Sequence, residues 1–167
     1  MTYDWQLYAI AFLALWSAMV GGVFSAFSEF IMKALMRSAP AASIEAMQQI
    51  NKTVIPTQFV AGIFIISIAS VALAVFSFDR FVGLARFSLI AAAVLYVTSV
   101  FLMTLFGNVP MNNRLARLDH TTAEAETYWR QYGRNWTRLN HVRTLGSIAT
   151  AGVYVFAAIT LISTGQV

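Results

Sequence analysis

Glu29 is the carboxylate in this sequence best placed to act as a general base. It directly follows residues 5–28, a stretch without Asp, Glu, Lys, Arg or His. An ionisable residue at the end of so long an apolar span often faces the interior of a helix bundle, where a desolvated carboxylate can accept a proton from a substrate. Glu29 can equally be a carboxylate at the membrane surface, with Lys33 one turn later as its partner. The sequence leaves both interpretations open.

His141 is the second candidate base. On a continuous helix its side chain points about 120° away from Trp129, towards Arg130 and Arg134, so a kink is needed to bring it to the Trp129 face. The chain contains two histidines, His120 and His141, and no cysteine. Disulfides, thiolate nucleophiles and iron–sulfur clusters are therefore excluded, and neither a bis-histidine haem nor a three-histidine metal site is expected.

Five polar side chains are suited to holding an oxygen anion, and we expect them to converge at the Glu29 end of the molecule. They are Gln58, Asn108, Asn112, Asn140 and Arg143. Each one alone can be explained by helix capping or by the positive charge of a cytoplasmic loop. Because an intramembrane carboxylate and guanidinium are costly unless paired, we expect Glu29, Asn108, Asn140 and Arg143 to form one cluster with an ion pair.

Three aromatic side chains accompany this polar group along a predicted helix. At about 100° per residue, one helical face collects the aromatic residues with two of the polar ones, and the opposite side collects three arginines. The first face contains Trp129, Tyr132, Gly133, Trp136, Asn140 and Arg143, and the second contains Arg130, Arg134 and Arg138. The aromatic residues can form the wall of a pocket for a flat aromatic ligand or an aromatic belt at the membrane interface.

The elements that position these residues are transmembrane helices. Four stretches lack ionisable residues, and each exceeds the roughly 20 residues that a helix needs to cross a bilayer. They are residues 5–28, 53–78, 87–113 and 144–167. The chain is 59% hydrophobic and 11% charged, whereas soluble domains carry about 25% charged residues. We predict an all-α, four-helix transmembrane bundle forming a single domain, 1–167, with spans at about 5–36, 54–78, 81–106 and 142–164 and almost no structure outside the membrane.

The connections contain their own helical signals. Residues 43–51 predict a short amphipathic helix in the first loop, and Pro56 fits the first turn of the second span. Gly107 to Asn113 contains Gly and Pro and predicts a break after the third span. Thr121-Thr122-Ala123-Glu124 matches a capping box, so a longer helix is expected to begin there and to continue into the fourth span.

The basic residues are sorted by loop. The first and third loops with their flanks hold nine of the eleven Lys and Arg residues, and the second loop holds Arg80 and Arg86. Because basic residues in short loops are retained in the cytoplasm, this predicts both termini outside it. The net charge of +4 is explained by this sorting, and no nucleic-acid partner is expected.

Four segments are recognisable together: Phe24-Ser25-Ala26-Phe27, Met47-Gln48-Gln49-Ile50-Asn51, Gly107-Asn108-Val109-Pro110-Met111-Asn112, and the helix carrying Trp129, Tyr132, Trp136, Asn140 and Arg143. Together they resemble the anthrone oxygenase-like membrane family, over essentially the whole chain. The family is common in bacteria, which implies the bacterial inner membrane, and its fungal members are implicated in oxidising anthrones to anthraquinones.

The resemblance implies a monooxygenase that uses dioxygen as co-substrate without a metal or flavin. An anthrone can lose a proton to give an electron-rich anion that reacts directly with dioxygen. Such an enzyme needs a base, an anion stabiliser and a dry aromatic slot. Glu29 or His141 would supply the base. The stabilising and wall residues would be Asn108, Asn112, Asn140, Arg143, Trp129, Tyr132 and Trp136.

A non-enzymatic membrane subunit or scaffold that binds lipid or quinone is the competing interpretation, because basic loops and interfacial Trp residues also suit it. Glu29, Asn108, Asn140 and Arg143 lining one enclosed cavity would favour an enzyme, and lipid-facing positions would favour a scaffold. A transporter is disfavoured because no inverted repeat is visible. The expected partners are membrane lipid and a small hydrophobic or aromatic substrate, and a homo-oligomer is compatible with the sequence.

Overall fold

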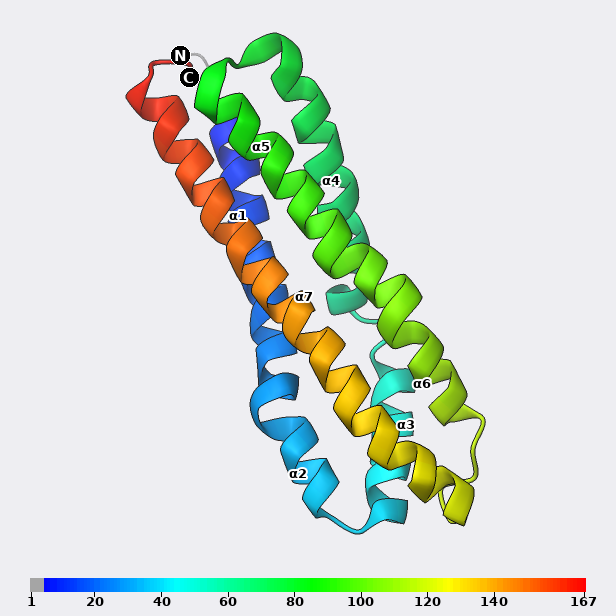
Figure 1. The fold of residues 1–167 in the computed structure, drawn as a ribbon. Coiled ribbons are helices and arrows are strands. Elements are labelled where there is room, and N and C mark those ends of the chain that lie inside the picture. The colour runs from blue at the N-terminus through cyan, green and yellow to red at the C-terminus, as the bar shows by residue number, and fades with distance from the viewer. Residues whose placement is uncertain (1–4) are drawn as a thin grey trace.

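The computed structural model describes residues 5–167, which form helices and connecting turns without a β-strand. Four of its continuous helices are long and apolar enough to cross a membrane, and they pack as a bundle (Figure 1). These helices comprise Trp5–Arg37, Gln58–Arg80, Gly83–Ala116 and Ala123–Ser163. The predicted all-α transmembrane bundle is confirmed, and the chain is an integral membrane protein.

Two of the four long helices contain π-helical turns. The first consists of α1 (Trp5–Ala26), a π segment (Phe27–Ile31) and α2 (Met32–Arg37). The third consists of α5 (Gly83–Tyr96), two π segments (Val97–Leu102 and Thr104–Asn108) and α6 (Val109–Ala116). The second and fourth are α4 (Gln58–Arg80) and α7 (Ala123–Ser163), and a shorter helix, α3 (Pro40–Thr53), lies in the first loop.

The long helices differ greatly in length. At 1.5 Å per residue, the 23 residues of α4 extend about 35 Å, enough to cross a hydrocarbon layer of about 30 Å. The 41 residues of α7 extend about 60 Å, twice that thickness. In Figure 1 the α3–α4 connection lies about halfway along the bundle, and α3 covers the half that α4 does not reach. Parts of α7 and α3 are therefore expected to lie outside the hydrocarbon layer, in contrast to the expectation of almost no domain outside the membrane.

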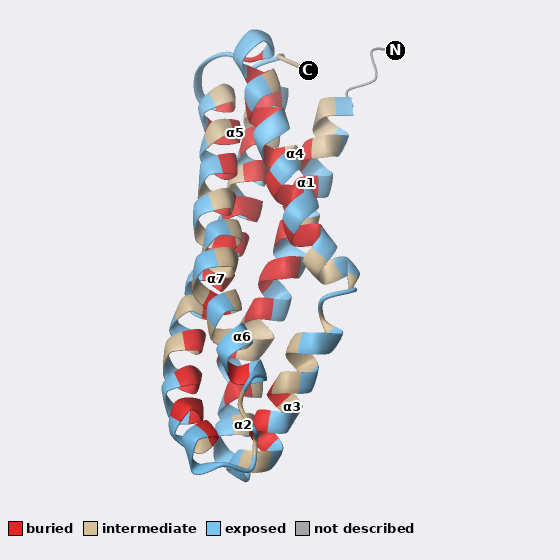
Figure 2. Cartoon of the chain, turned by 90° about the vertical axis from the view of Figure 1, so that its right-hand side faces the viewer, coloured by how far each residue is buried: buried red, intermediate tan, exposed pale blue. Residues whose placement is uncertain are grey.

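Each half of the molecule has its own hydrophobic core. In the half that contains α4, apolar residues of α1, α4, α5 and α7 pack together, including Ile10, Ile66, Leu89 and Tyr154. In the other half, α2, α3, α6 and the first half of α7 surround a second core. That core contains Met32, Ile44, Met47, Leu115, Ala125, Tyr128, Trp129, Tyr132 and Trp136. Figure 2 shows the buried residues along the inward faces of the helices over the whole length of the bundle.

The third long helix does not break where Gly107 and Pro110 predicted a break. It continues to Ala116, because the π segment Thr104–Asn108 absorbs the irregularity and the N–H of Val109 bonds to the carbonyl of Thr104. Pro110 then lies in the first turn of α6, where its missing N–H leaves no helical bond unmade. Residues that usually mark the start of a helix, such as Pro110, therefore lie inside a continuous helix here.

Other predicted boundaries need smaller corrections. The short helix in the first loop is confirmed but begins at Pro40 and ends at Thr53. Pro56 lies in the turn before α4 and not in its first turn. The long helix after the third span is confirmed, but its N-cap is Thr122, whose hydroxyl oxygen accepts a hydrogen bond from the Ala125 N–H at 3.2 Å. The predicted reciprocal cap by Glu124 therefore does not form.

Candidate functional site

A pocket of about 730 Å³ lies between the two cores, at the level where α3 ends and α4 begins. This volume falls in the range of small-molecule sites, about 300–1,000 Å³. Most of the lining is apolar, with aromatic rings from α1, α4, the third long helix and α7. The aromatic lining residues are Phe24, Phe27, Phe59, Phe64, Phe101 and Trp136, and the polar ones include Gln48, Asn51, Lys52, Thr104, Asn108, Asn112 and Arg143.

Arg143 brings a positive charge into this apolar pocket. Its side chain is 5% exposed, and the centre of its guanidinium lies 4.2 Å from the ring centroid of Phe24 and 5.3 Å from that of Trp136. Both contacts are in the range of cation–π interactions. The rings shield the charge from water and stabilise it in part.

Arg143 has no carboxylate partner. The one ion pair among residues 5–167 joins Arg130 to Glu126 on the exposed side of α7. The guanidinium of Arg143 donates to Asn140 Oδ1 at 2.6 Å and, in a longer contact of 3.4 Å, to Thr104 Oγ1. Its Nε is buried without a hydrogen-bond partner in the protein. Because a desolvated charge without a counter-charge is costly, an anionic ligand would stabilise this arrangement.

Asn140 contacts Arg143 and does not line the pocket. The Asn140 Nδ2 donates at 2.6 Å to the carbonyl of Phe24 and at 2.6 Å to Ser28 Oγ. Both acceptors belong to the first long helix, at and just before its π segment. The amide thus joins α7 to α1 and leaves its oxygen for the guanidinium of Arg143.

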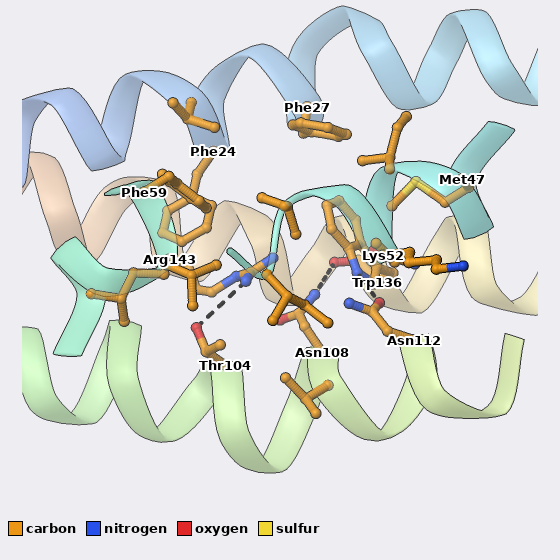
Figure 3. A pocket seen from close by; sticks show the side chains of 18 of the residues that line it. Phe24, Phe27, Met47, Lys52, Phe59, Thr104, Asn108, Asn112, Trp136 and Arg143 are labelled. Carbon is orange, nitrogen blue, oxygen red and sulfur yellow. Dashed lines mark hydrogen bonds between the residues drawn. The ribbon is translucent and has the colours of Figure 1, made fainter. Parts of the chain in front are cut away.

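Asn108, at the pocket wall, has a buried acceptor without a hydrogen-bond partner. It is 1% exposed, its Nδ2 donates to the carbonyl of Trp136 at 3.2 Å, and its Oδ1 has no partner in the protein. Figure 3 shows Thr104, Asn108 and Asn112 in a row along the third long helix, facing Arg143 and Trp136. Their spacing of four residues places them on one helical face.

Asn112 is fixed by two donors from α7. Its Oδ1 accepts hydrogen bonds from the Tyr132 hydroxyl at 2.9 Å and from Trp136 Nε1 at 2.9 Å. The Tyr132 hydroxyl also receives a 3.4 Å contact from Asn51 Nδ2 on α3. Because both donors need the amide oxygen, the NH2 group of Asn112 is left for the pocket.

The structure brings together part of the residue set that the sequence indicated. Asn108, Asn112, Trp136 and Arg143 line the pocket, and Asn140 lies directly behind Arg143. Trp129 and Tyr132 do not line the pocket and do not form an exposed aromatic belt, because both are buried in the second core. Their rings are stacked with centroids 5.5 Å apart. Tyr132 reaches the pocket only through its bond to Asn112.

Neither candidate base lies in the pocket. Glu29 is exposed and accepts a 3.0 Å hydrogen bond from Ser25 Oγ, so the expected ion pair with Arg143 is wrong. His141 is exposed, and Gln58 is the exposed first residue of α4; neither lines the pocket. No Asp, Glu or His of residues 5–167 is among the lining residues. The roles assigned to Glu29, His141 and Gln58 have no structural counterpart in this site.

Several lining residues were missed from the sequence. Thr104 lies one turn before Asn108 on the same face, so its spacing offered a signal. Phe24 and Asn51 lie in segments that carried the family resemblance, although no role was assigned to either. Phe59 and Lys52 gave no sequence signal, because one is an aromatic residue in an apolar span and the other a lysine in a basic loop.

A family model described as anthrone oxygenase matches residues 46–153, more than half of the chain. The matched region contains every pocket residue from α3, α4, the third long helix and α7, and it excludes those from α1. No curated protein and no solved structure gives a significant match.

Proposed function

The chain belongs to the anthrone oxygenase family, and from this premise we propose that it is a membrane oxygenase that binds an ionisable aromatic substrate as its anion and oxidises it with dioxygen. One observation carries the proposal: a buried guanidinium, Arg143, faces an aromatic-lined pocket of about 730 Å³ and has no carboxylate partner among the described residues. A flat, weakly acidic aromatic molecule supplies both the missing charge and the apolar surface.

Arg143 acts on the substrate by favouring its ionised form. A positive charge in a desolvated site lowers the pKa of an acidic ligand that binds beside it. The negative charge of the resulting anion is delocalised over the aromatic rings of the substrate. On the protein side, the guanidinium of Arg143 lies over the rings of Phe24 and Trp136. The arrangement is preorganised, because Asn140 and Thr104 already hold the guanidinium in place.

The oxidation needs no electron donor other than the substrate. The substrate carbanion transfers one electron to dioxygen, and the resulting radical and superoxide combine to form a C–O bond. Protonation gives a hydroperoxide, which loses water as the remaining hydrogen on that carbon leaves as a proton and the O–O bond breaks. A methylene group and one dioxygen thus become a carbonyl group and one water. We therefore propose that dioxygen is the co-substrate and that the reaction requires no organic cofactor or metal.

The proton released on ionisation passes to water in this proposal. The pocket lining offers no carboxylate or imidazole among residues 5–167, and its basic residues are Lys52 and Arg143. Lys52, on the α3 side of the pocket, is exposed, and we propose that water reaches the pocket from this side. Electrostatic stabilisation of the anion takes the place of a dedicated general base.

We also propose that both termini lie outside the cytoplasm, in a bacterial inner membrane. The start of α1 and the end of α7 lie at the same end of the bundle (Figure 1). Of the nine basic residues in the first and third loops and their flanks, Lys52 and Arg143 line the pocket, which leaves seven against the two of the second loop. That excess still favours a cytoplasmic location for the α2–α3 and α6–α7 connections.

The proposal is tested with protein purified in lipid nanodiscs and anthrone as the probe. We expect anthrone-dependent oxygen consumption with one dioxygen used per carbonyl formed, and a loss of at least about 100-fold in kcat/KM for Arg143→Met. Arg138→Met is the matched control, because Arg138 is exposed on the same helix and lies outside the pocket. Equal rates for wild type and Arg143→Met would contradict the proposal. Stoichiometric phospholipid or quinone that anthrone does not displace would instead establish a non-enzymatic binding subunit.

A further inference from the structure

The outer side of α7 changes from cationic to apolar where the helix enters the membrane. Three residues, Arg134, Arg138 and His141, are exposed there and form what we call the basic stripe. At about 100° per residue they lie within about 60° of one another, on the side of the helix opposite Trp136. Figure 2 shows exposed residues along this outer side of α7. We infer that the basic stripe binds the phosphate group of an anionic phospholipid in the leaflet next to the α2–α3 and α6–α7 connections.

The start of α4 indicates where the hydrocarbon layer begins. This helix is about long enough to cross that layer, and it begins at the pocket, where Phe59 of α4 and Arg143 of α7 both line the wall. The boundary on α7 therefore lies near Arg143. At 1.5 Å per residue, His141 lies about 3 Å and Arg138 about 8 Å outside this level. The headgroup layer extends about 5–8 Å beyond the hydrocarbon on each side, so both residues lie at the depth of the lipid phosphates.

The positive charge of the stripe is not neutralised within the described part of the chain. Neither Arg134 nor Arg138 has a carboxylate within 4 Å among residues 5–167, where the one ion pair joins Arg130 to Glu126. Glu29, an exposed carboxylate on the neighbouring α1–α2 helix, accepts a hydrogen bond within its own helix. The two arginines of the stripe are therefore free to pair with an anion outside the protein.

A phospholipid matches this surface at both of its ends. The guanidinium of Arg138 can donate two parallel hydrogen bonds to phosphate oxygens, and the imidazole N–H of His141 can donate another. The same side of α7 continues into the membrane with Leu145 and Ile148, which are 69% and 52% exposed. Acyl chains of the bound lipid pack along these two side chains. A soluble phosphate would gain only the polar half of this contact.

The net charge of the headgroup sets the expected selectivity. Phosphatidylcholine carries a quaternary ammonium group beside its phosphate, and the arginines of the stripe repel that cation. Phosphatidylglycerol has the phosphate without the cation. Arg134 lies about 6 Å beyond Arg138 along the helix, within the Debye length of about 8 Å at physiological salt, so its charge adds to the attraction. A basic residue close to an anionic lipid surface contributes about 1 kcal/mol, or about fivefold in affinity.

The test titrates the purified full-length protein in detergent with phosphatidylglycerol or phosphatidylcholine of identical acyl chains, and native mass spectrometry counts the bound lipid. For the wild type we expect phosphatidylglycerol to bind about 10-fold more tightly. Arg138→Gln should reduce this ratio to about twofold, and the double variant Arg134→Gln/Arg138→Gln should abolish the preference. Arg117→Gln is the matched control, because Arg117 is an exposed arginine at the end of α6 and not on α7, and it should retain the wild-type ratio.

Three outcomes would overturn the inference. Equal affinity of the wild type for both lipids would show that the stripe does not select anionic headgroups. An equal fall of the ratio in Arg117→Gln would show that net charge, and not the stripe, sets the preference. Displacement of phosphatidylglycerol by an equimolar amount of glycerol 3-phosphate would identify a soluble phosphate as the ligand. None of these results bears on the oxygenase proposal, because no residue of the stripe lines the pocket.

Discussion

Asn140 accepts a 2.6 Å hydrogen bond from the guanidinium of Arg143, which lies one turn further along α7. The same amide donates two hydrogen bonds to the first long helix, at Phe24 and Ser28. The position of the buried charge therefore depends on how α7 packs against α1. Asn140 is a positioning residue in this arrangement, because it touches Arg143 and does not line the pocket.

Asn140→Ala is expected to weaken the substrate complex without abolishing the reaction. It removes three buried hydrogen bonds, so we expect a loss of about 1–3 kcal/mol of stability and a fall of about 10- to 100-fold in kcat/KM as Arg143 becomes less ordered. In this variant the pKa of the bound ligand should still lie below its value in solution, whereas an unfolded protein would cause no such shift. Asn135→Ala is the control. Unchanged kinetics with normal melting would show that Arg143 is held without Asn140.

Glu29→Gln and His141→Gln are expected to retain activity within about twofold of the wild type, because substitutions of exposed groups that contact nothing reactive have small effects. Both side chains are exposed and neither lines the pocket. Turnover and melting temperature are measured together. Loss of turnover in Glu29→Gln at an unchanged melting temperature would restore Glu29 as the catalytic base.

The affinity for an ionisable aromatic ligand should depend on pH through the ligand. Because Arg143 favours the anion, the pKa of the bound ligand lies below its value in solution, and binding between these two values releases a proton. Below the pKa of the bound ligand, both the free and the bound ligand are neutral, so the affinity no longer depends on pH. Absorbance titration of a bound phenol or anthrone measures this shift, and Arg143→Met should abolish it. A bound ligand that ionises at its solution pKa in the wild type would exclude anion binding.

Gly146→Ala should destabilise the bundle by about 1–3 kcal/mol through overpacking. A Cβ at Gly146 would collide with the Oγ and Cβ atoms of Ser99, in the π segment Val97–Leu102 of the third long helix. Gly152→Ala on α7 meets no atom within 4 Å and serves as the control. Combining Gly146→Ala with Ser99→Gly should recover part of the loss, as chemical denaturation of the single and double variants can measure. If the changes in the free energy of unfolding of the two single variants simply add in the double variant, Gly146 and Ser99 do not determine how closely the two helices pack.

Asp119 gives the α6–α7 connection a dependence on pH. The backbone N–H of Thr121, followed by its hydroxyl, donates to the Asp119 carboxylate and lowers the pKa of this group. The stabilisation is therefore present above the pKa of the unfolded chain and is lost as the pH falls through the lower folded value. The protection factor of the 119–122 turn against hydrogen exchange, which removes the intrinsic pH dependence of exchange, should fall below that range. Asp119→Asn should remove this change, and a wild-type protection factor that does not depend on pH would refute the prediction.

The transmembrane spans and the pocket-facing side of α7 could be predicted because each depends on local patterns. Stretches without charge identify membrane helices, and a period of 3.6 residues placed Trp136, Asn140 and Arg143 on one face, where all three are buried. The direction in which Glu29 points could not be obtained in this way. Lipid is as apolar as the bundle interior, so composition alone does not distinguish the inward face of a membrane helix from its outward face.

The π segments also lay beyond prediction from sequence. The Gly107-Asn108-Val109-Pro110 segment has the composition of a break, yet the helix continues through it with one bond from Val109 to the carbonyl of Thr104. Whether such a segment ends a helix or widens one turn depends on what packs against it, and here Leu139 of α7 lies against Gly107. The same long-range packing buries Asn108 and places Thr104 beside Arg143.

Two pocket residues in the spans, Val23 and Phe64, are 40% and 43% exposed. Because both residues lie in apolar spans, we expect a molecule dissolved among the acyl chains to reach the site from the side of the bundle. For a poorly water-soluble substrate, the relevant concentration is then its mole fraction in the bilayer. Adding empty vesicles at a constant total amount of substrate should slow turnover by surface dilution, although the bulk concentration is unchanged.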